Sequence, residues 1–317
     1  KDSNGLHWIE DVPTEFSWDK IDAGYYEGDA SATKNPIAGS KWKLQKFQNG
    51  NYVDEGSEIT DCVADAASGC TGTDKDHRAG KFKLTGLTLG KYRLYESEAP
   101  EGYQTPTNVY YYFELSTKTP GDTTPVKWTK GTSTSFNTTD GSYNGNRVRS
   151  VQEPKAPNYR KTGSVTWTKV DAENTNKVLG GSEWKIRFKA EGDTAFGGYY
   201  TVIDCTSTPS KCAVPGTPNN QPNWAYDRHG SSGWFQLRDL PWGTYELVET
   251  KAPDGYNLST ETYTFTVSKS NVNTTIAITG TDVSDNKIPN EPGFELPSTG
   301  GEGNTLIVLS GVALTAI

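Results

Sequence analysis

Hydrophobic and polar residues alternate with a period of two along several short segments of the chain. The alternation is clear in 42–44, 82–84, 92–94 and 263–267, where aromatic and aliphatic residues alternate with Lys, Arg and Thr. Gly and Pro separate these segments, and no stretch has a 3.6-residue period with helix caps. Short strands at roughly regular spacing, bounded by turn signals, predict an all-β protein built of β-sandwiches.

Five sequence blocks occur twice in the same order, which indicates an internal duplication. The block pairs are 16–22 and 165–171, 37–44 and 179–186, 80–84 and 233–237, 90–103 and 243–256, and 155–158 and 287–290. We therefore expect two tandem domains. The predicted boundaries are 1–13 as a linker or the end of an upstream domain, 14–159 as domain 1, 160–291 as domain 2, 292–301 as a sorting signal and 302–317 as a truncated hydrophobic tail.

Domain 1 carries two segments without a counterpart in domain 2, near 24–34 and within 117–147. Both are rich in Gly, Ser, Thr and Asn, which is typical of surface loops. We therefore expect both insertions to be loops.

The composition excludes several classes of protein. Aromatic residues make up 11% of the chain, with nine Trp and seventeen Tyr, so the chain can bury surface and is not disordered. A net charge of −8 argues against a nucleic-acid partner, because phosphate binding needs clustered Lys and Arg. Mean hydropathy is −0.70, which excludes a polytopic membrane protein. The sequence has no Met and stops within an apolar run, so we expect a fragment of a longer chain.

The four cysteines form two local pairs, Cys62 with Cys70 and Cys205 with Cys212. Three pairings are formally possible, and the local one is favoured because both pairs occupy the same place in the repeat. A zinc site is the alternative, but the gaps are wider than the usual CxxC and the chain has only three His. We expect two disulfides, no metal site and an oxidising compartment.

Each repeat also holds a Lys in its first strand, a Glu in a middle strand and an Asn in its last strand. The two sets are Lys20, Glu96 and Asn158, and Lys169, Glu249 and Asn290. Segments 92–103 and 245–256 both fit the pattern YxLxExxAPxGY. The chain thereby resembles the CnaB-type repeat of Gram-positive surface proteins, also called the SpaA-like pilin domain, over about 280 residues. The resemblance implies two tandem Ig-like or prealbumin-like β-sandwiches.

The resemblance further implies an intramolecular isopeptide bond between Lys and Asn in each domain, with Glu96 and Glu249 as proton shuttles. Burial lowers the pKa of a Lys amine and makes it a nucleophile. The same desolvation keeps Glu protonated, so that it can donate a hydrogen bond to the Asn carbonyl. The reaction occurs once per domain and needs no cofactor, so we expect a protein that is not an enzyme in the usual sense.

A sorting motif of the LPXTG type is the last signal in the sequence. It comprises Leu296, Pro297, Ser298, Thr299 and Gly300, and a Gly-rich spacer and an apolar run follow it. The resemblance implies that a sortase cuts after Thr299 and joins it to an amine of peptidoglycan or of a neighbouring pilin. Association with the membrane would be transient, before sorting. We expect a secreted protein anchored to the Gram-positive cell wall.

These features favour a rigid stalk in a surface adhesin or in a tip or base subunit of a pilus, whose ligand the sequence does not identify. A shaft subunit is disfavoured, because Glu153-Pro154-Lys155 lacks the Tyr of a YPK-type linking motif. One alternative is a wall-anchoring spacer of a secreted enzyme whose catalytic domain lies upstream. Another is carbohydrate binding by exposed aromatics such as Trp128, Tyr143 or Trp224. No GxSxG, HExxH or P-loop motif is present.

Overall fold

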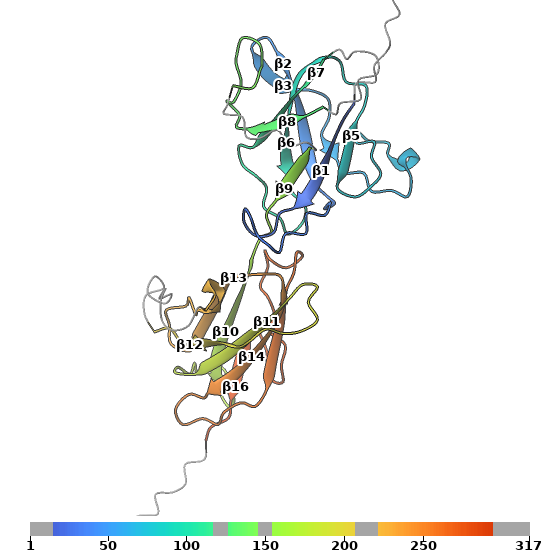
Figure 1. Cartoon of the computed structure of the whole chain (residues 1–317). Helices are drawn as coiled ribbons and strands as arrows, with labels where there is room; N and C mark the ends of the chain where they lie inside the picture. The colour runs from blue at the N-terminus through green and yellow to red at the C-terminus, as the bar shows by residue number, and fades with distance from the viewer. Residues whose placement is uncertain (1–14, 117–125, 145–153, 207–220, 294–317) are drawn as a thin grey trace, which may run out of the picture. The chain divides into compact units, whose positions relative to one another are not determined.

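The computed structural model describes residues 15–116, 126–144, 154–206 and 221–293 (Figure 1). The chain divides into two units, 1–161 and 162–317. In the described residues of both units the regular elements are strands, joined by loops and short 3-10 turns, which confirms the all-β prediction.

The first unit contains two sheets. Its strands are β1 (Phe16–Asp22), β2 (Lys41–Gln48), β3 (Asn51–Asp54), β4 (Ile59–Thr60), β5 (Lys81–Leu84), β6 (Gly90–Glu98), β7 (Tyr110–Leu115), β8 (Trp128–Gly131) and β9 (Lys155–Asn158), with a 3-10 turn, η1 (Ala67–Gly69). One sheet has the order β5-β1-β9, and the other has the order β3-β2-β6-β7-β8 with β4 paired to β2. In the small sheet, β1 runs antiparallel to β5 and parallel to β9.

The second unit repeats this plan. Its strands are β10 (Gly163–Asp171), β11 (Glu183–Ala190), β12 (Tyr200–Ile203), β13 (Trp234–Leu240), β14 (Gly243–Lys251), β15 (Thr262–Val267) and β16 (Lys287–Asn290), with a 3-10 turn, η3 (Asn223–Ala225). The sheet orders are β13-β10-β16 and β12-β11-β14-β15. The first strand of the unit again pairs in parallel with the last.

Aromatic side chains from both sheets fill the core of each unit. In the first, Trp18 stacks on Phe82 with ring centroids 4.8 Å apart, and it meets Trp42 of the other sheet edge-on at 5.6 Å. In the second, Trp167 stacks on Phe235 at 4.7 Å. The inward positions alternate along the strands as the sequence pattern predicts, and their burial against the facing sheet is the main source of stability.

The prediction that the second insertion is a surface loop is partly wrong. Residues 128–131 form β8, which adds to the large sheet beside β7. Trp128 is only 2% exposed and stacks on Tyr111 at 4.2 Å. Val126 and Trp128 are two alternating apolar positions in an otherwise polar segment, which is a short period-two signal, yet both pack on the core.

Within the described ranges, no helix has the length and apolar character that crossing a membrane requires. The same ranges hold no group of three or more His, Cys, Asp or Glu arranged to hold a metal ion.

Candidate functional site

Adjacent parallel strands bring Lys20 and Asn158 to one face of the small sheet of domain 1. The register places Lys20 opposite Ala156 and Asp22 opposite Asn158. Asn158 therefore lies two positions beyond the partner of Lys20, so both side chains point to the same side. That side is the core, since Lys20 is 0% exposed and Asn158 is 1% exposed.

Domain 2 repeats this register between β10 and β16. Lys169 lies opposite Ile288, and Asn290 lies opposite Asp171. Both Lys169 and Asn290 are buried. The sequence thus builds the same diagonal Lys–Asn pair twice, on the first and last strands of each domain.

The glutamates reach these pairs from the opposite sheet. Glu96 is an inward-facing residue of β6, and its Oε2 accepts a hydrogen bond of 3.0 Å from the Nζ of Lys20. Glu249 is an inward-facing residue of β14, and its Oε1 lies 3.3 Å from the Nζ of Lys169. In both domains the pairing of the glutamate strand with its neighbour, β6 with β2 and β14 with β11, has a register irregularity directly after the Glu. Such a bulge re-aims a side chain, and it occurs here at equivalent places.

A tryptophan closes each site on one side. The Nζ of Lys20 lies 5.2 Å from the ring centroid of Trp42, and that of Lys169 lies 5.3 Å from Trp184. The indole Nε1 of each Trp donates to a buried serine, Ser40 or Ser182. The rings help to exclude water from the amines, and they are part of the site although their sequence signal is that of core residues.

Burial changes the acidity of the amines. Loss of hydration lowers the pKa of both Lys20 and Lys169 from 10.5 to about 8, against the opposing attraction of the facing glutamates. Desolvation also raises the pKa of Glu96 above its usual value. These shifts favour a neutral amine next to a protonated carboxyl group.

The asparagine amides are oriented differently from the expected arrangement, in which Glu donates to the Asn carbonyl. In domain 2, the Nδ2 of Asn290 donates both to Oε2 of Glu249 and to the main-chain carbonyl of Asn257, each at 2.9 Å. Because a main-chain carbonyl only accepts, the nitrogen of the amide must face it. In domain 1, Nδ2 of Asn158 donates likewise to the carbonyl of Gln104 at 3.0 Å. In domain 2 the glutamate therefore contacts the amide nitrogen.

This orientation leaves the side-chain carbonyl oxygens of Asn158 and Asn290 buried without a hydrogen-bond partner. Buried polar atoms are rarely left unpaired, and each exception calls for an explanation. Here the unpaired atom belongs to the group that an amine would attack.

A glycine fixes the main chain of each lysine. The carbonyl of Gly80 accepts the N–H of Lys20, and that of Gly233 accepts the N–H of Lys169, both at 2.8 Å. Both glycines have positive φ, and a Cβ on Gly80 would lie 2.6 Å from the main-chain nitrogen of Ile37. Only glycine fits this place without displacing the neighbouring chain.

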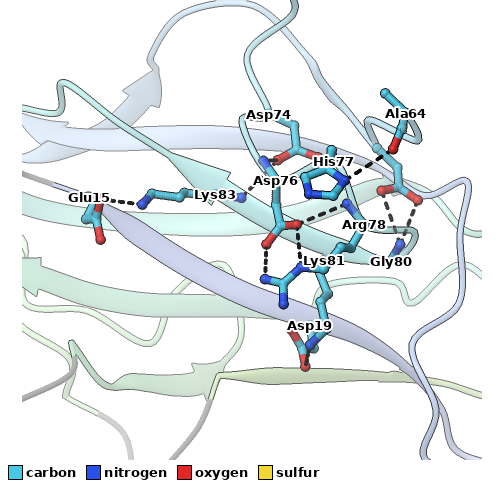
Figure 2. Close-up of polar contacts among 11 residues, drawn as sticks. Glu15, Asp19, Ala64, Asp74, Asp76, His77, Arg78, Gly80, Lys81 and Lys83 are labelled. Carbon is cyan, nitrogen blue, oxygen red and sulfur yellow. Dashed lines mark hydrogen bonds and ion pairs between the residues drawn. The ribbon is translucent and has the colours of Figure 1, made fainter. Parts of the chain in front are cut away.

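Sequence reasoning missed a buried aspartate that ties the cysteine-bearing loop to the small sheet. Asp74 is fully buried and accepts the N–H group of Cys62. It also accepts the N–H groups of Asp76 and Lys83 (Figure 2). A half-buried ion pair joins β1 to β5 in the same sheet, between Asp19 and Lys81 at 2.7 Å.

Asp227 has the same role in domain 2, where it accepts the N–H groups of Cys205, His229 and Gln236. Each aspartate precedes its strand partner by nine residues, and this shared spacing is the signal that could have identified both.

One predicted disulfide lies wholly within the described residues. Cys62 and Cys70 are bonded, with their Cα atoms 5.8 Å apart. Cys205 is also disulfide-bonded. The remaining cysteine, Cys212, lies outside the described residues, as do the five residues of the sorting motif, 296–300.

Of the aromatic residues considered for carbohydrate binding, Trp128 is a core residue and is not available. Tyr143 and Trp224 are half-buried. Tyr143 packs against Tyr112 with ring centroids 5.7 Å apart, and Trp224 packs edge-on against Tyr245 at 5.5 Å. Both therefore support the packing of their own domains.

Comparison with known proteins gives a family match and several relatives. The family model described as SpaA, prealbumin-like fold domain, matches residues 28–132 and 163–282, more than two thirds of the chain. A fimbrial subunit type 1 from Actinomyces viscosus is 40% identical over 72 residues, which is 23% of this chain and 13% of that protein.

Two solved structures represent the structural matches. The C-terminal fragment of the pilus adhesin SpaC from Lactobacillus rhamnosus GG matches with a TM-score of 0.34 and 16% identity, over 89% of this chain and 100% of that one. The TIE protein of Bacillus anthracis matches with a TM-score of 0.38 and 16% identity, over 88% of this chain and 34% of that one.

The family match covers both units, and each unit has the strand order and the paired first and last strands described above. The expected resemblance to SpaA-like domains and the expected pair of prealbumin-like sandwiches are confirmed. The chain belongs to the SpaA family of prealbumin-like fold domains and contains two of them.

Proposed function

We propose that this chain is the stalk of a pilus or surface-adhesin subunit, and that an isopeptide bond between its first and last strands locks each domain. The observation that carries the proposal is the twofold occurrence of one buried Lys–Glu–Asn arrangement at the same register. The match to a fimbrial subunit supports a place on the cell surface.

The proposed reaction joins the Nζ of Lys to the Cγ of Asn and releases ammonia. The Nζ–Cγ bond forms, the Cγ–Nδ2 bond breaks, and a proton from Nζ reaches the leaving nitrogen through the glutamate. A pKa near 8 increases the neutral fraction of each amine at neutral pH by about 300-fold over an exposed Lys. Fixed proximity in the core supplies the remaining advantage.

The position of the glutamate suits this shuttle. In domain 2 one carboxyl oxygen lies 3.3 Å from the Nζ of Lys169, and the other accepts a hydrogen bond from the Nδ2 of Asn290 at 2.9 Å. A proton taken from the amine on one side can therefore pass to the leaving nitrogen on the other.

We further propose that a sortase cleaves the chain after Thr299 and attaches it to peptidoglycan or to a neighbouring pilin. This part of the proposal rests on the sequence of residues 296–300 and on their place after the second domain.

Mass spectrometry of tryptic peptides from reduced protein tests the crosslinks. We expect branched peptides that join Lys20 to Asn158 and Lys169 to Asn290, each about 17 Da lighter than the sum of its two parts. In Glu249→Ala the domain 2 branch should disappear while the domain 1 branch persists as an internal control. Linear peptides with intact Lys20 and Lys169 in the wild type would refute the proposal.

A further inference from the structure

The two sites differ in one main-chain hydrogen bond to the glutamate. In domain 2 the N–H of Ser259 donates to Oε2 of Glu249 at 2.9 Å. The Nδ2 of Asn290 donates to the same oxygen, also at 2.9 Å. Oε2 thus accepts two N–H groups, while Oε1 faces the Nζ of Lys169.

Domain 1 has a proline where domain 2 has Ser259. The two loops correspond, because the main-chain carbonyls of Gln104 and Asn257 accept the two asparagine amides in the same way. Two residues further on stand Pro106 and Ser259, and both are half-buried. A proline nitrogen carries no hydrogen, so Pro106 cannot make this bond.

Within the described part of the chain, Glu96 accepts a hydrogen bond from the Nζ of Lys20 at Oε2. The Oε1 of Glu96 and the Oε1 of Glu249 are both buried without a hydrogen-bond partner, so the two glutamates differ at Oε2. Glu96 thus lacks the main-chain donor that Glu249 has.

We propose that the main-chain amide of Ser259 is a positioning group that binds Oε2 of Glu249, so that the domain 2 bond closes more slowly than the domain 1 bond. The inference rests on the proposed function. Before Nζ attacks Cγ, a proton must pass from the lysine ammonium to the glutamate. A hydrogen bond from an N–H group stabilises the carboxylate more than the neutral acid and therefore opposes this transfer.

Other titratable side chains lie near Glu249 and contribute to the pH dependence of the reaction in domain 2. Lys169 faces it from β10, and Tyr263 approaches it from β15. A cavity of about 240 Å³, lined in part by Ser259 and Asn290, lies on this side of the site, and Glu261 and Asp282 also line it.

The closure rates of the two domains test the inference. Unreacted protein is refolded from denaturant between about pH 6 and pH 9, and the branched peptide of each domain is quantified against time. We expect domain 2 to close about tenfold more slowly than domain 1, because one hydrogen bond to a charged group changes a rate by roughly that factor. Ser259→Pro should accelerate domain 2 by a similar factor and move the acid limb of its rate profile to higher pH.

Ser259→Ala is the matched control, because it keeps the N–H and removes only the hydroxyl group, which bonds the hydroxyl of Tyr263 at 2.9 Å. Its rate and its acid limb should stay at the wild-type values. If Ser259→Pro does not fold, the ratio of the closure rates of the two domains in the wild type tests the inference. Equal rates in the wild type would overturn the inference and leave the proposed function standing. Absence of closure in both domains would refute the proposed function and this inference with it.

Discussion

Burial of the charged lysines of the two sites lowers the free energy of unfolding of the unreacted protein. Removing a charged pair from water costs several kcal/mol, which attraction between the charges repays only with good geometry. Lys20 and Glu96 are buried together among aromatic rings, and an oxygen of Glu96 is left unpaired. Conversion of the amine into an amide would remove both charges, so the proposed bond relieves a cost that the unreacted core carries.

This cost predicts a pH dependence of stability in protein that cannot react, such as Asn158→Ala/Asn290→Ala. The pKa of each lysine is about 8 in the folded state and 10.5 in the unfolded state. Between these values the unfolded state binds more protons, so the free energy of unfolding rises with pH. Denaturant titrations between about pH 8 and pH 10 should show a gain of about 2 kcal/mol per lysine.

The wild type is the control for that experiment. Its lysines would be amides, which do not titrate, so the same gain should be missing. A stability of the double variant that falls over this window would contradict the burial of charged amines in the unreacted core.

The side-chain members of the site could be predicted from the sequence because the duplication presents them twice. A single Lys or Asn has many roles, whereas Lys20 and Lys169 occupy the same place in two copies. The amide of Ser259 could not be found in this way, since every residue but proline has an N–H and its direction depends on the folded loop. The orientation of the Asn amides depends on the main-chain carbonyls of Gln104 and Asn257 and was likewise not predictable.

At the scale of elements, the parallel pairing of the first and last strands makes the site possible. Its register places Asn158 diagonally next to Lys20, and a one-residue slip would turn Asn158 away from the core. The alternation of the strands was predictable from the sequence. The strand at 128–131 was not predicted, because Val126 and Trp128 are only two alternating apolar positions in a polar segment and the strand depends on packing of Trp128 against Tyr111.

Asp74 holds the disulfide loop against β5, and its removal should destabilise domain 1. Asp74→Ala leaves three main-chain N–H groups without their acceptor, which should lower the free energy of unfolding by roughly 3 kcal/mol. Asp54→Ala, on an exposed position of β3, should change it by less than about 0.5 kcal/mol. Equal effects of the two substitutions in urea titrations would show that Asp74 does not organise the loop.

At the scale of the whole molecule, the proposed bonds join strands that lie near the two ends of each domain. A pull on the chain would then act on a covalent link and could not peel the first strand from the last. Closing a loop of more than a hundred residues also restricts the unfolded chain, by about 5 kcal/mol on the loop-entropy model. Resistance to pulling is the property that a stalk domain needs.

The sorting proposal predicts where the full-length protein is found in a host that has a sortase. Wild type should be released only by enzymes that digest the cell wall, whereas Thr299→Ala should shift the protein to the membrane and the medium, because the scissile peptide is no longer recognised. Fractionation with detection by antibody measures the shift. Wild-type protein that stays with the membrane after wall digestion would mean that the apolar run after residue 304 is a permanent anchor.

The intact mass of the reduced protein shows whether both isopeptide bonds have formed. Each closed domain has lost one ammonia, so the account predicts a mass about 34 Da below that calculated from the sequence. Reduction removes the contribution of the disulfides. A reduced mass equal to the sequence mass would contradict the account.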